Sequence, residues 1–410
     1  MKIEELLSDA LWEQACEQPP PGPGFVERVL AARRRRRARR FAAAAGVTAA
    51  AAAVALVAVT AGAPLPHSGK GDERPSSVLH SGAVSARPDQ SPPRDLIAAG
   101  RSALAAYYTT RTVRQSADLA VGERTYWLLN PGTGRYEKDA RWSVVAVAPG
   151  LRTAAVLERE LPAARIGLLD LATGEVERWI PVSHAVGGLA FSADGRRLVA
   201  TTYSGNPDIF VKITDAHTGR FTWGPRFGST PRTGFEVLDV ASGRGTWARV
   251  APDRAVQGRE DFAFGRAGDL LYGRVVGPRD GMEQFYDVTG RKVAAPGNER
   301  RLRWDVSARL SPDGRLAAWG LVAEPHGTSY SSIRDPLTGK EITRVRGAEL
   351  LAWADDKRLI AWERDPHEER YRPRLVLVTI GSAKVVPLSG YQKRDMDDAS
   401  GYWQPVFADR

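Results

Sequence analysis

Two turn motifs that alternate along the chain limit its possible folds more than any other feature. The first is an Asp-Gly turn, or a polar equivalent, between two apolar runs; it occurs at Asp194-Gly195, Asp313-Gly314 and Asp355-Asp356, with weaker copies at Pro149-Gly150 and Gly268-Asp269. The second is D-x-x-[TS]-G, which begins at Asp170, Asp215, Asp239 and Asp335, with variants at Asn130 and Asp287. Gly and Asp tolerate the positive φ angles of tight turns, so the motifs predict a succession of short β-hairpins.

The spacing of these turns indicates which all-β fold to expect. From Asn130 to Asp170 to Asp215 the steps are 40 and 45 residues. A period of about 40 to 45 residues that carries four strands is typical of a β-propeller blade. Neither a β-sandwich nor a simple barrel has a reason to repeat at this interval.

The sequence therefore predicts an all-β propeller domain over residues 96–410. Five blades are expected near residues 142–180, 187–224, 259–295, 305–345 and 347–387. The two ends complete a sixth, because residues 106–138 supply three strands and residues 402–408, with Trp403, Val406 and Phe407, supply the inner one. Pairing the ends removes exposed sheet edges. A hairpin within 225–258 leaves a degenerate seventh blade open, and a short helix is expected over 95–106.

On these motifs the chain resembles WD-repeat-like propellers and, in layout, the membrane-anchored propeller proteins of actinobacteria. The residues that carry the resemblance are the S-x-D-G turns at Ser192–Gly195 and Ser311–Gly314, together with the D-x-x-T-G turns. The Gly-His and Trp-Asp dipeptides of the WD family are missing. The resemblance thus implies a propeller architecture, and it implies no particular partner.

A membrane anchor is predicted at residues 41–63, which contain no charge and no proline. As a helix this segment is about 34 Å long, against a hydrocarbon core of about 30 Å. Seven arginines within Arg33–Arg40 stand directly before it, whereas no basic residue follows until Lys70. The positive-inside rule then places the N-terminus in the cytoplasm and the large domain outside the cell membrane.

The apolar segment has three other interpretations. Cleavage of a signal peptide after Ala61-Gly62-Ala63 would leave Pro64 at the new N-terminus, and the region before the cut is unusually long. A twin-arginine signal lacks the usual residue between Arg39-Arg40 and Phe41. A lipoprotein would need a cysteine just after the apolar run, where none stands.

The segments on either side of this anchor are predicted to lack a packed core. Residues 1–40 show two short amphipathic stretches separated by a proline-rich break at 19–24, typical of a juxtamembrane tail whose Arg33–Arg40 cluster binds lipid headgroups. A docking helix for a cytoplasmic partner is the alternative. Residues 64–95 are rich in Ser, Gly, Pro and charge and are predicted to be a flexible linker.

Composition excludes several classes of protein. The formal charge of +10 is the small difference between 58 basic and 48 acidic residues, so it favours a mixed surface and no nucleic-acid partner. Cys16 is the only cysteine, and the large domain therefore has neither a disulfide nor a thiolate metal site. The stability of the large domain must therefore come from its hydrophobic core.

The search for chemical motifs yields no catalytic, cofactor-binding or metal-binding residue, and no cofactor is expected. The six histidines are His67, His80, His184, His217, His326 and His367, and no two have ligand spacing. Asp194, Asp313 and Asp355 could hold a cation, but turn chemistry explains them. Eight tryptophans in or beside apolar strands are predicted to be core: Trp127, Trp142, Trp179, Trp223, Trp304, Trp319, Trp353 and Trp362. Residues 363–374 form a charged insertion, expected to be a solvated loop or a functional rim.

The leading hypothesis is therefore a non-enzymatic binding, sensing or scaffold protein. Its partners would be the bilayer, through residues 41–63 and Arg33–Arg40, and a protein, peptide or cell-wall ligand on the propeller. The alternative is an envelope enzyme of lyase or glycosidase type, which would bring two carboxylates or histidines together at the central channel. A third possibility is a signal carrier with the 40-residue tail as its output.

Overall fold

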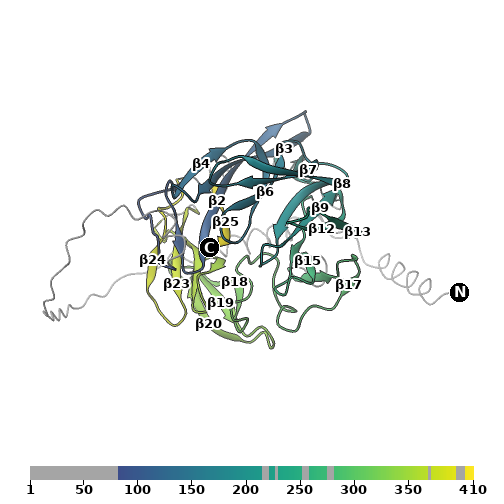
Figure 1. Cartoon of the computed structure of the whole chain (residues 1–410). Helices are drawn as coiled ribbons and strands as arrows, with labels where there is room; N and C mark the ends of the chain where they lie inside the picture. Colours follow the sequence, from purple (N-terminus) through teal and green to yellow (C-terminus); the bar gives the residue numbers. More distant parts are fainter. Residues whose placement is uncertain are drawn as a thin grey trace, which may run out of the picture. The chain divides into compact units, whose positions relative to one another are not determined.

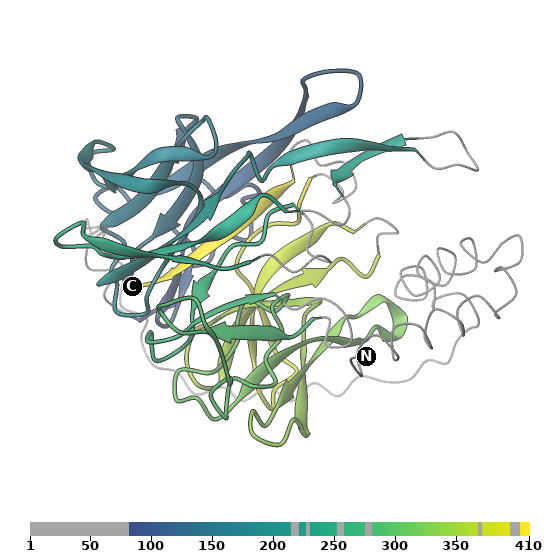
Figure 2. The same cartoon turned by 90° about the vertical axis from the view of Figure 1, so that its right-hand side faces the viewer.

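The computed structural model describes residues 82–214, 221–226, 230–251, 258–274, 281–367, 371–393 and 402–410. Of the described residues, 323–327 belong to a second, smaller compact unit. The described residues form an all-β structure and contain no α-helix (Figures 1 and 2). The elements are β1 (Ala98–Ala99), β2 (Ser102–Arg114), β3 (Leu119–Asn130), β4 (Arg135–Asp139), β5 (Trp142–Val147), β6 (Thr153–Glu158), β7 (Ala163–Asp170), β8 (Val176–Phe191), β9 (Arg197–Tyr203), β10 (Ile209–Thr214), β11 (Phe221–Pro225), β12 (Arg232–Asp239), β13 (Gly245–Arg249), β14 (Ala263–Phe264), β15 (Leu271–Arg274), β16 (Glu283–Tyr286), β17 (Lys292–Val293), β18 (Ala317–Ala323), the 3-10 helix η1 (Pro325–Gly327), β19 (Tyr330–Arg334), β20 (Glu341–Arg346), β21 (Glu349–Trp353), β22 (Arg358–Arg364), β23 (Pro373–Thr379), β24 (Val385–Pro387) and β25 (Trp403–Asp409).

The predicted turns are confirmed where they are described. In the first motif the Ser192 hydroxyl donates to Asp194 at 2.6 Å, and Gly195 has a φ of 69°. In the second, the amide of Gly174 donates to the carbonyl of Asp170 at 2.8 Å, with a φ of 72° at the glycine. The Asp215 copy lies outside the described residues. Each turn thus reverses the chain between antiparallel strands, as the residue types require.

The pairing of the two ends is also confirmed. β25 pairs antiparallel with β2 from Ser102↔Asp409 to Thr109↔Trp403. On its other side β2 pairs with β3, and β3 pairs with β4, which gives the predicted order of inner, second, third and outer strand. Figure 1 shows β25 beside β2, at opposite ends of the colour scale.

The predicted division into six separate blades is not confirmed, because the described strands form five sheets and these do not close into a full propeller. The second sheet has the order β13-β12-β9-β8-β7-β6-β5. β8 is long enough to pair with β7 through its first part and with β9 through its second part. One strand thus belongs to two four-stranded groups, β5-β6-β7-β8 and β8-β9-β12-β13.

The remaining strands follow the predicted blades closely. β14 to β17 form one four-stranded sheet, and β21 to β24 form another. β18, β19 and β20 form a three-stranded sheet, to which the isolated bridge Leu310↔Ala317 adds an inner position. Counting β8 twice, the pairings define six groups of four along the chain.

The expected blade at 187–224 is wrong in its outer half. β10 and β11 were expected to follow β9 within one blade, but β10 pairs with β3 of the first sheet. The outer half comes instead from β12 and β13, the hairpin around Ser242-Gly243. That hairpin therefore completes a four-stranded group and is no seventh blade.

The helix predicted over residues 95–106 is wrong, because these residues include β1 and the start of β2. Its alanines favour a helix by propensity, but Ala98, Ala99 and Ala103 are fully buried between strands, where a small side chain fits. The linker predicted over residues 64–95 also extends too far toward the C-terminus. Ser85 pairs with Ala98, and Gln90 is buried, so residues 82–95 pack against the β-domain.

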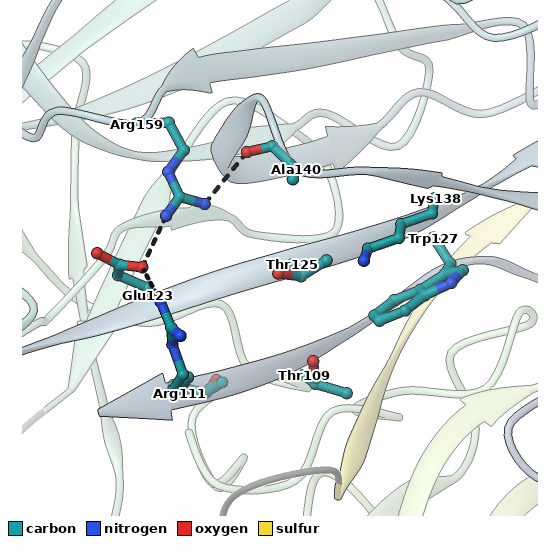
Figure 3. Close-up of a pocket in the computed structure, with 9 residues that line it drawn as sticks. Thr109, Arg111, Glu123, Thr125, Trp127, Lys138, Ala140 and Arg159 are labelled. Atoms are coloured by element: carbon teal, nitrogen blue, oxygen red, sulfur yellow. Dashed lines mark hydrogen bonds and ion pairs between the residues drawn. The ribbon is translucent and has the colours of Figure 1, made fainter. Parts of the chain in front are cut away.

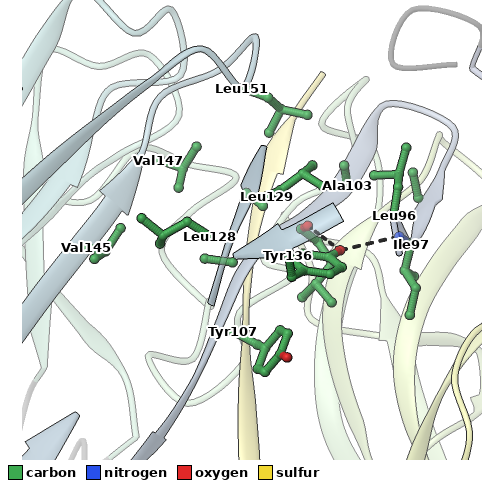
Figure 4. Close-up of a cluster of buried hydrophobic side chains, with 14 of the residues drawn as sticks. Leu96, Ile97, Ala103, Tyr107, Leu128, Leu129, Tyr136, Val145, Val147 and Leu151 are labelled. Atoms are coloured by element: carbon green, nitrogen blue, oxygen red, sulfur yellow. Dashed lines mark hydrogen bonds between the residues drawn. The ribbon is translucent and has the colours of Figure 1, made fainter. Parts of the chain in front are cut away.

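The largest core cluster lies where the two ends of the chain meet, between the first sheet and its neighbours (Figure 4). Tyr136 of β4 donates its hydroxyl to the carbonyl of Leu104 at 2.7 Å and accepts the amide of Ile97 at 3.3 Å. Trp403 is almost fully buried against Tyr107 and Trp362. Burial of these aromatic rings stabilises the pairing of β2 with β25.

The predicted membrane anchor at 41–63, the tail at 1–40 and most of the linker lie outside the described residues. Within the part that is described, no helix has the length and apolar character needed to cross a membrane.

Candidate functional site

The candidate site is a cavity of about 630 Å³ bordered by the inner strands of the sheets, called here the inner-strand cavity. Its walls come from β25, β5, the second part of β8 and β21, and from the segments around Arg266 and residues 307–312. Every one of the six four-stranded groups therefore contributes. Ligand pockets have volumes of about 300–1,000 Å³, so a small molecule or short peptide fits this space.

The cavity wall combines apolar and polar surface and consists of strand edges. The apolar residues that line it are Val145, Val147, Leu189, Phe191, Leu310, Leu351, Val406 and Phe407, with several alanines between them. Among the described strands, β5, β21 and β25 each pair with a neighbour on one side only. Their other edges present backbone N–H and C=O groups, which an extended peptide can pair with.

The charged groups at the cavity are two arginines and one aspartate. Arg101 and Asp409 form an ion pair at 2.5 Å. Arg266 donates instead to main-chain carbonyls, at 2.7 Å to Ser311 and also to Pro312. No carboxylate of the described residues forms an ion pair with Arg266, so the described lining carries one net positive charge. A carboxylate on a ligand would complement it.

Two of the three serines that line the cavity use their hydroxyls in structural hydrogen bonds. Ser102 donates to the carbonyl of Trp353 at 2.8 Å, and Ser192 donates to Asp194. The described lining contains no histidine.

The aspartates considered as cation ligands serve their own turns. Asp194 accepts from Ser192 and from the amide of Arg196, and these hydrogen bonds hold the pKa of its carboxyl below the usual value. Asp313 makes the same contacts with Ser311 and Arg315. Asp355 accepts from the amides of Lys357 and Arg358. The turn interpretation is confirmed, and no group of three potential metal ligands occurs in the described part of the chain.

The other sequence candidates do not converge on the cavity, apart from Trp353. His184 stacks on Trp247 at 3.8 Å between ring centroids, and His367 lies in the loop after β22. His67, His80 and His217 are outside the described residues. Trp142, Trp353 and Trp362 are buried as predicted, whereas Trp304 is 41% exposed.

The charged insertion is shorter than the sequence indicates. Glu363 belongs to β22 and Arg374 to β23, and Glu363 is buried. Its carboxylate accepts hydrogen bonds from Arg346 and, at 2.9 Å, from Arg374. These charges therefore link two neighbouring sheets.

Sequence reasoning missed the residues that give the cavity its charge. Arg101, Arg266 and Asp409 follow no known site motif, and each is separated from the others by more than a hundred residues. The usable signal was positional: Arg266 lies in a first-motif turn, and Asp409 lies at the end of the predicted inner strand.

Comparison with known proteins gives no family. No protein-family model and no curated protein matches the chain. Among solved structures, hydrazine synthase of Kuenenia stuttgartiensis is similar with a TM-score of 0.34 and 15% identity, over 60% of this chain and 67% of that one.

Two dipeptidyl peptidases give similar scores. A putative dipeptidyl aminopeptidase IV of Bacteroides ovatus has a TM-score of 0.36 and 12% identity, over 68% of this chain. Dipeptidyl peptidase 4 of Porphyromonas gingivalis has a TM-score of 0.36 and 10% identity, over 70% of this chain. The chain spans 43% and 44% of the lengths of these two peptidases. All three TM-scores are below 0.5, so neither fold nor function is inferred from them.

Proposed function

We propose that the protein is a membrane-anchored, extracytoplasmic β-propeller of six blades that binds an extended apolar peptide and is not an enzyme. The inner-strand cavity is the observation that carries this proposal. It combines apolar side chains, strand edges without a second partner among the described strands, and the Arg266 charge. An extended peptide that ends in a carboxylate satisfies all three.

Contacts between successive groups support the six-blade arrangement. The amide of Gly150 donates to the carbonyl of Asp409, and the amide of Ala308 donates to that of Leu350. The first and last groups meet where the amide of Arg101 donates to the carbonyl of Ala354 at 2.8 Å. The anchor at residues 41–63 and the cytoplasmic tail rest on the sequence alone.

The test is affinity selection of random hexapeptides with free carboxyl termini on the full chain in detergent, read by mass spectrometry. Ala190 lines the cavity, and Ala190→Trp fills part of it. We expect selected peptides to be rich in apolar residues and to be lost in this variant. Ala172→Trp, at an exposed turn position, is the matched control and should retain them. Selection that is equal in both variants would contradict the proposal.

The enzyme alternative is tested on the same preparation. We expect no turnover of dipeptidyl, glycoside or polyuronate substrates and no labelling by a fluorophosphonate serine probe. Turnover that Ala190→Trp abolishes would replace the binding proposal with an enzymatic one. The signal-carrier alternative depends on residues 1–40, and specific capture of one cytoplasmic protein by that tail would support it.

A further inference from the structure

A second pocket lies on the outer part of the first sheet, away from the residues that line the inner-strand cavity. It has a volume of about 540 Å³ and is called here the outer pocket (Figure 3). Its lining comes from β2, β3 and β4 and from the residues that follow β4 and β6. We propose that the outer pocket binds an acidic saccharide, which goes beyond the proposed function and does not depend on it.

Strand register explains why these side chains share one face. Thr109 of β2 pairs with Thr125 of β3, and Arg111 pairs with Glu123. Trp127 of β3 pairs with Lys138 of β4. Residues two apart along a strand point to the same side, so threonines, charges and the indole form one continuous surface.

The charges of this surface are not balanced. Arg111 and Arg159 both contact the same oxygen of Glu123, at 3.3 and 2.7 Å, so one carboxylate serves two guanidinium groups. Lys138 forms no ion pair with any described carboxylate. The carboxylate of Glu137, next to Lys138 in the chain, accepts a hydrogen bond from Asn130 instead. The carboxylate of Asp139 forms an ion pair with Arg141. Three cations against one anion leave two positive charges, which favour an acidic ligand.

The uncharged groups favour a sugar. The structure gives the hydroxyls of Thr109 and Thr125 no hydrogen-bond partner among the described residues. In Figure 3 the Lys138 ammonium is directed along β3 toward Thr125, above the indole of Trp127. That ring is held in place by Tyr107, stacked at 5.1 Å and 8°, and by Lys138 at 5.9 Å. Two free hydroxyls and an ammonium match the hydroxyls and the acid group of a uronic acid, and the indole forms a fixed wall beside them.

The test is titration calorimetry of the full chain at low salt with trigalacturonate, maltotriose and tripolyphosphate. Maltotriose lacks the acid groups, and tripolyphosphate lacks the sugar. We expect trigalacturonate to bind at least tenfold more tightly than either. Equal or tighter binding of tripolyphosphate would overturn the saccharide assignment in favour of a simple anion site, and absence of trigalacturonate binding would overturn the proposal altogether.

Variants locate the binding. Lys138→Gln should weaken trigalacturonate binding at least tenfold, the order expected for a charge-assisted hydrogen bond. Thr125→Val should weaken it about fivefold, as for a neutral hydrogen bond, and Thr125→Ser should restore it. Lys384→Gln removes one exposed charge elsewhere and should have no effect. Ala190→Trp should also leave this binding intact, which separates the result from that for the inner-strand cavity. Unchanged affinity in Lys138→Gln and Thr125→Val would overturn the assignment.

Discussion

Glu283 is a buried carboxyl group whose protonation couples the stability of the domain to pH. It lies beside Arg309, which also contacts Glu299 at 2.6 Å and Tyr272 at 3.8 Å from its ring centroid. Burial raises the pKa of Glu283 to about 7, because removal from water penalises the charged form more than Arg309 favours it. The folded protein therefore holds a proton that the unfolded chain has already lost near neutral pH.

The sign of the effect follows from this difference. Between pH 4.5, the ordinary value, and about 7, the folded state binds more protons, so the free energy of unfolding should fall as pH rises. The contribution is about 3 kcal/mol over the window. Urea melts at pH 5 and 7.5 should show a smaller fall in Glu283→Gln than in the wild type. Glu341→Gln, at a partly exposed position, is the control, and parallel profiles for Glu283→Gln and wild type would contradict the prediction.

At the scale of elements, the pairing of β25 with β2 depends on Trp403. Its ring contacts Tyr107 and Trp362, and its indole N–H donates to the hydroxyl of Ser91 at 3.1 Å. Trp403→Ala should lower the free energy of unfolding by about 3–5 kcal/mol, measured by chemical denaturation. Trp304→Ala, at a position 41% exposed, should cost much less. Equal losses in the two variants would show that the end strands do not depend on this core.

At the scale of elements, the sequence predicts the turns and the pairing of the two ends but not every strand partner. Turn motifs such as Asp170 to Gly174 predict hairpins, because their geometry depends on residues that are adjacent in the chain. The pairing of residues 402–408 was predictable as well, since an unpartnered inner strand at one end matched a missing one at the other. The strand that pairs with β10 was not predictable, because the motif at Asp215 predicts a turn without indicating which sheet its hairpin joins.

The candidate sites were harder to predict for the same physical reason. The inner-strand cavity draws Arg101, Arg266 and Asp409 from distant parts of the chain, and only the packing of several sheets brings them near one another. The outer pocket depends on strand register, which moves a side chain to the opposite face when it shifts by one residue. The helix expected over 95–106 failed because burial overrode the propensity of alanine.

At the scale of the whole molecule, residues 82–95 fasten the start of the domain to its end. The amide of Arg87 donates to the carbonyl of Leu388 at 2.8 Å, and the amide of Gly390 donates to that of Gln90 at 2.9 Å. Deleting residues 82–95 from the full chain should lower the free energy of unfolding by about 2–4 kcal/mol, because several buried polar groups lose their partners.

The control for this deletion is removal of residues 64–81, which the sequence predicts to be a linker. Differential scanning calorimetry should show a lower melting temperature only for the first deletion. A melting temperature that is unchanged by loss of residues 82–95 would mean that the domain begins at β1.

The pairing of β2 with β25 also determines when the domain can finish folding during its synthesis. Arg101 and Asp409, which join at this seam, are 308 residues apart. At a synthesis rate of about 5–20 residues per second, β25 is synthesised roughly 15–60 s after β2. The inner edge of β2 stays unpaired for that time. During that interval the growing chain exposes an unpaired strand to its neighbours, and the domain completes its fold only after β25 has been synthesised.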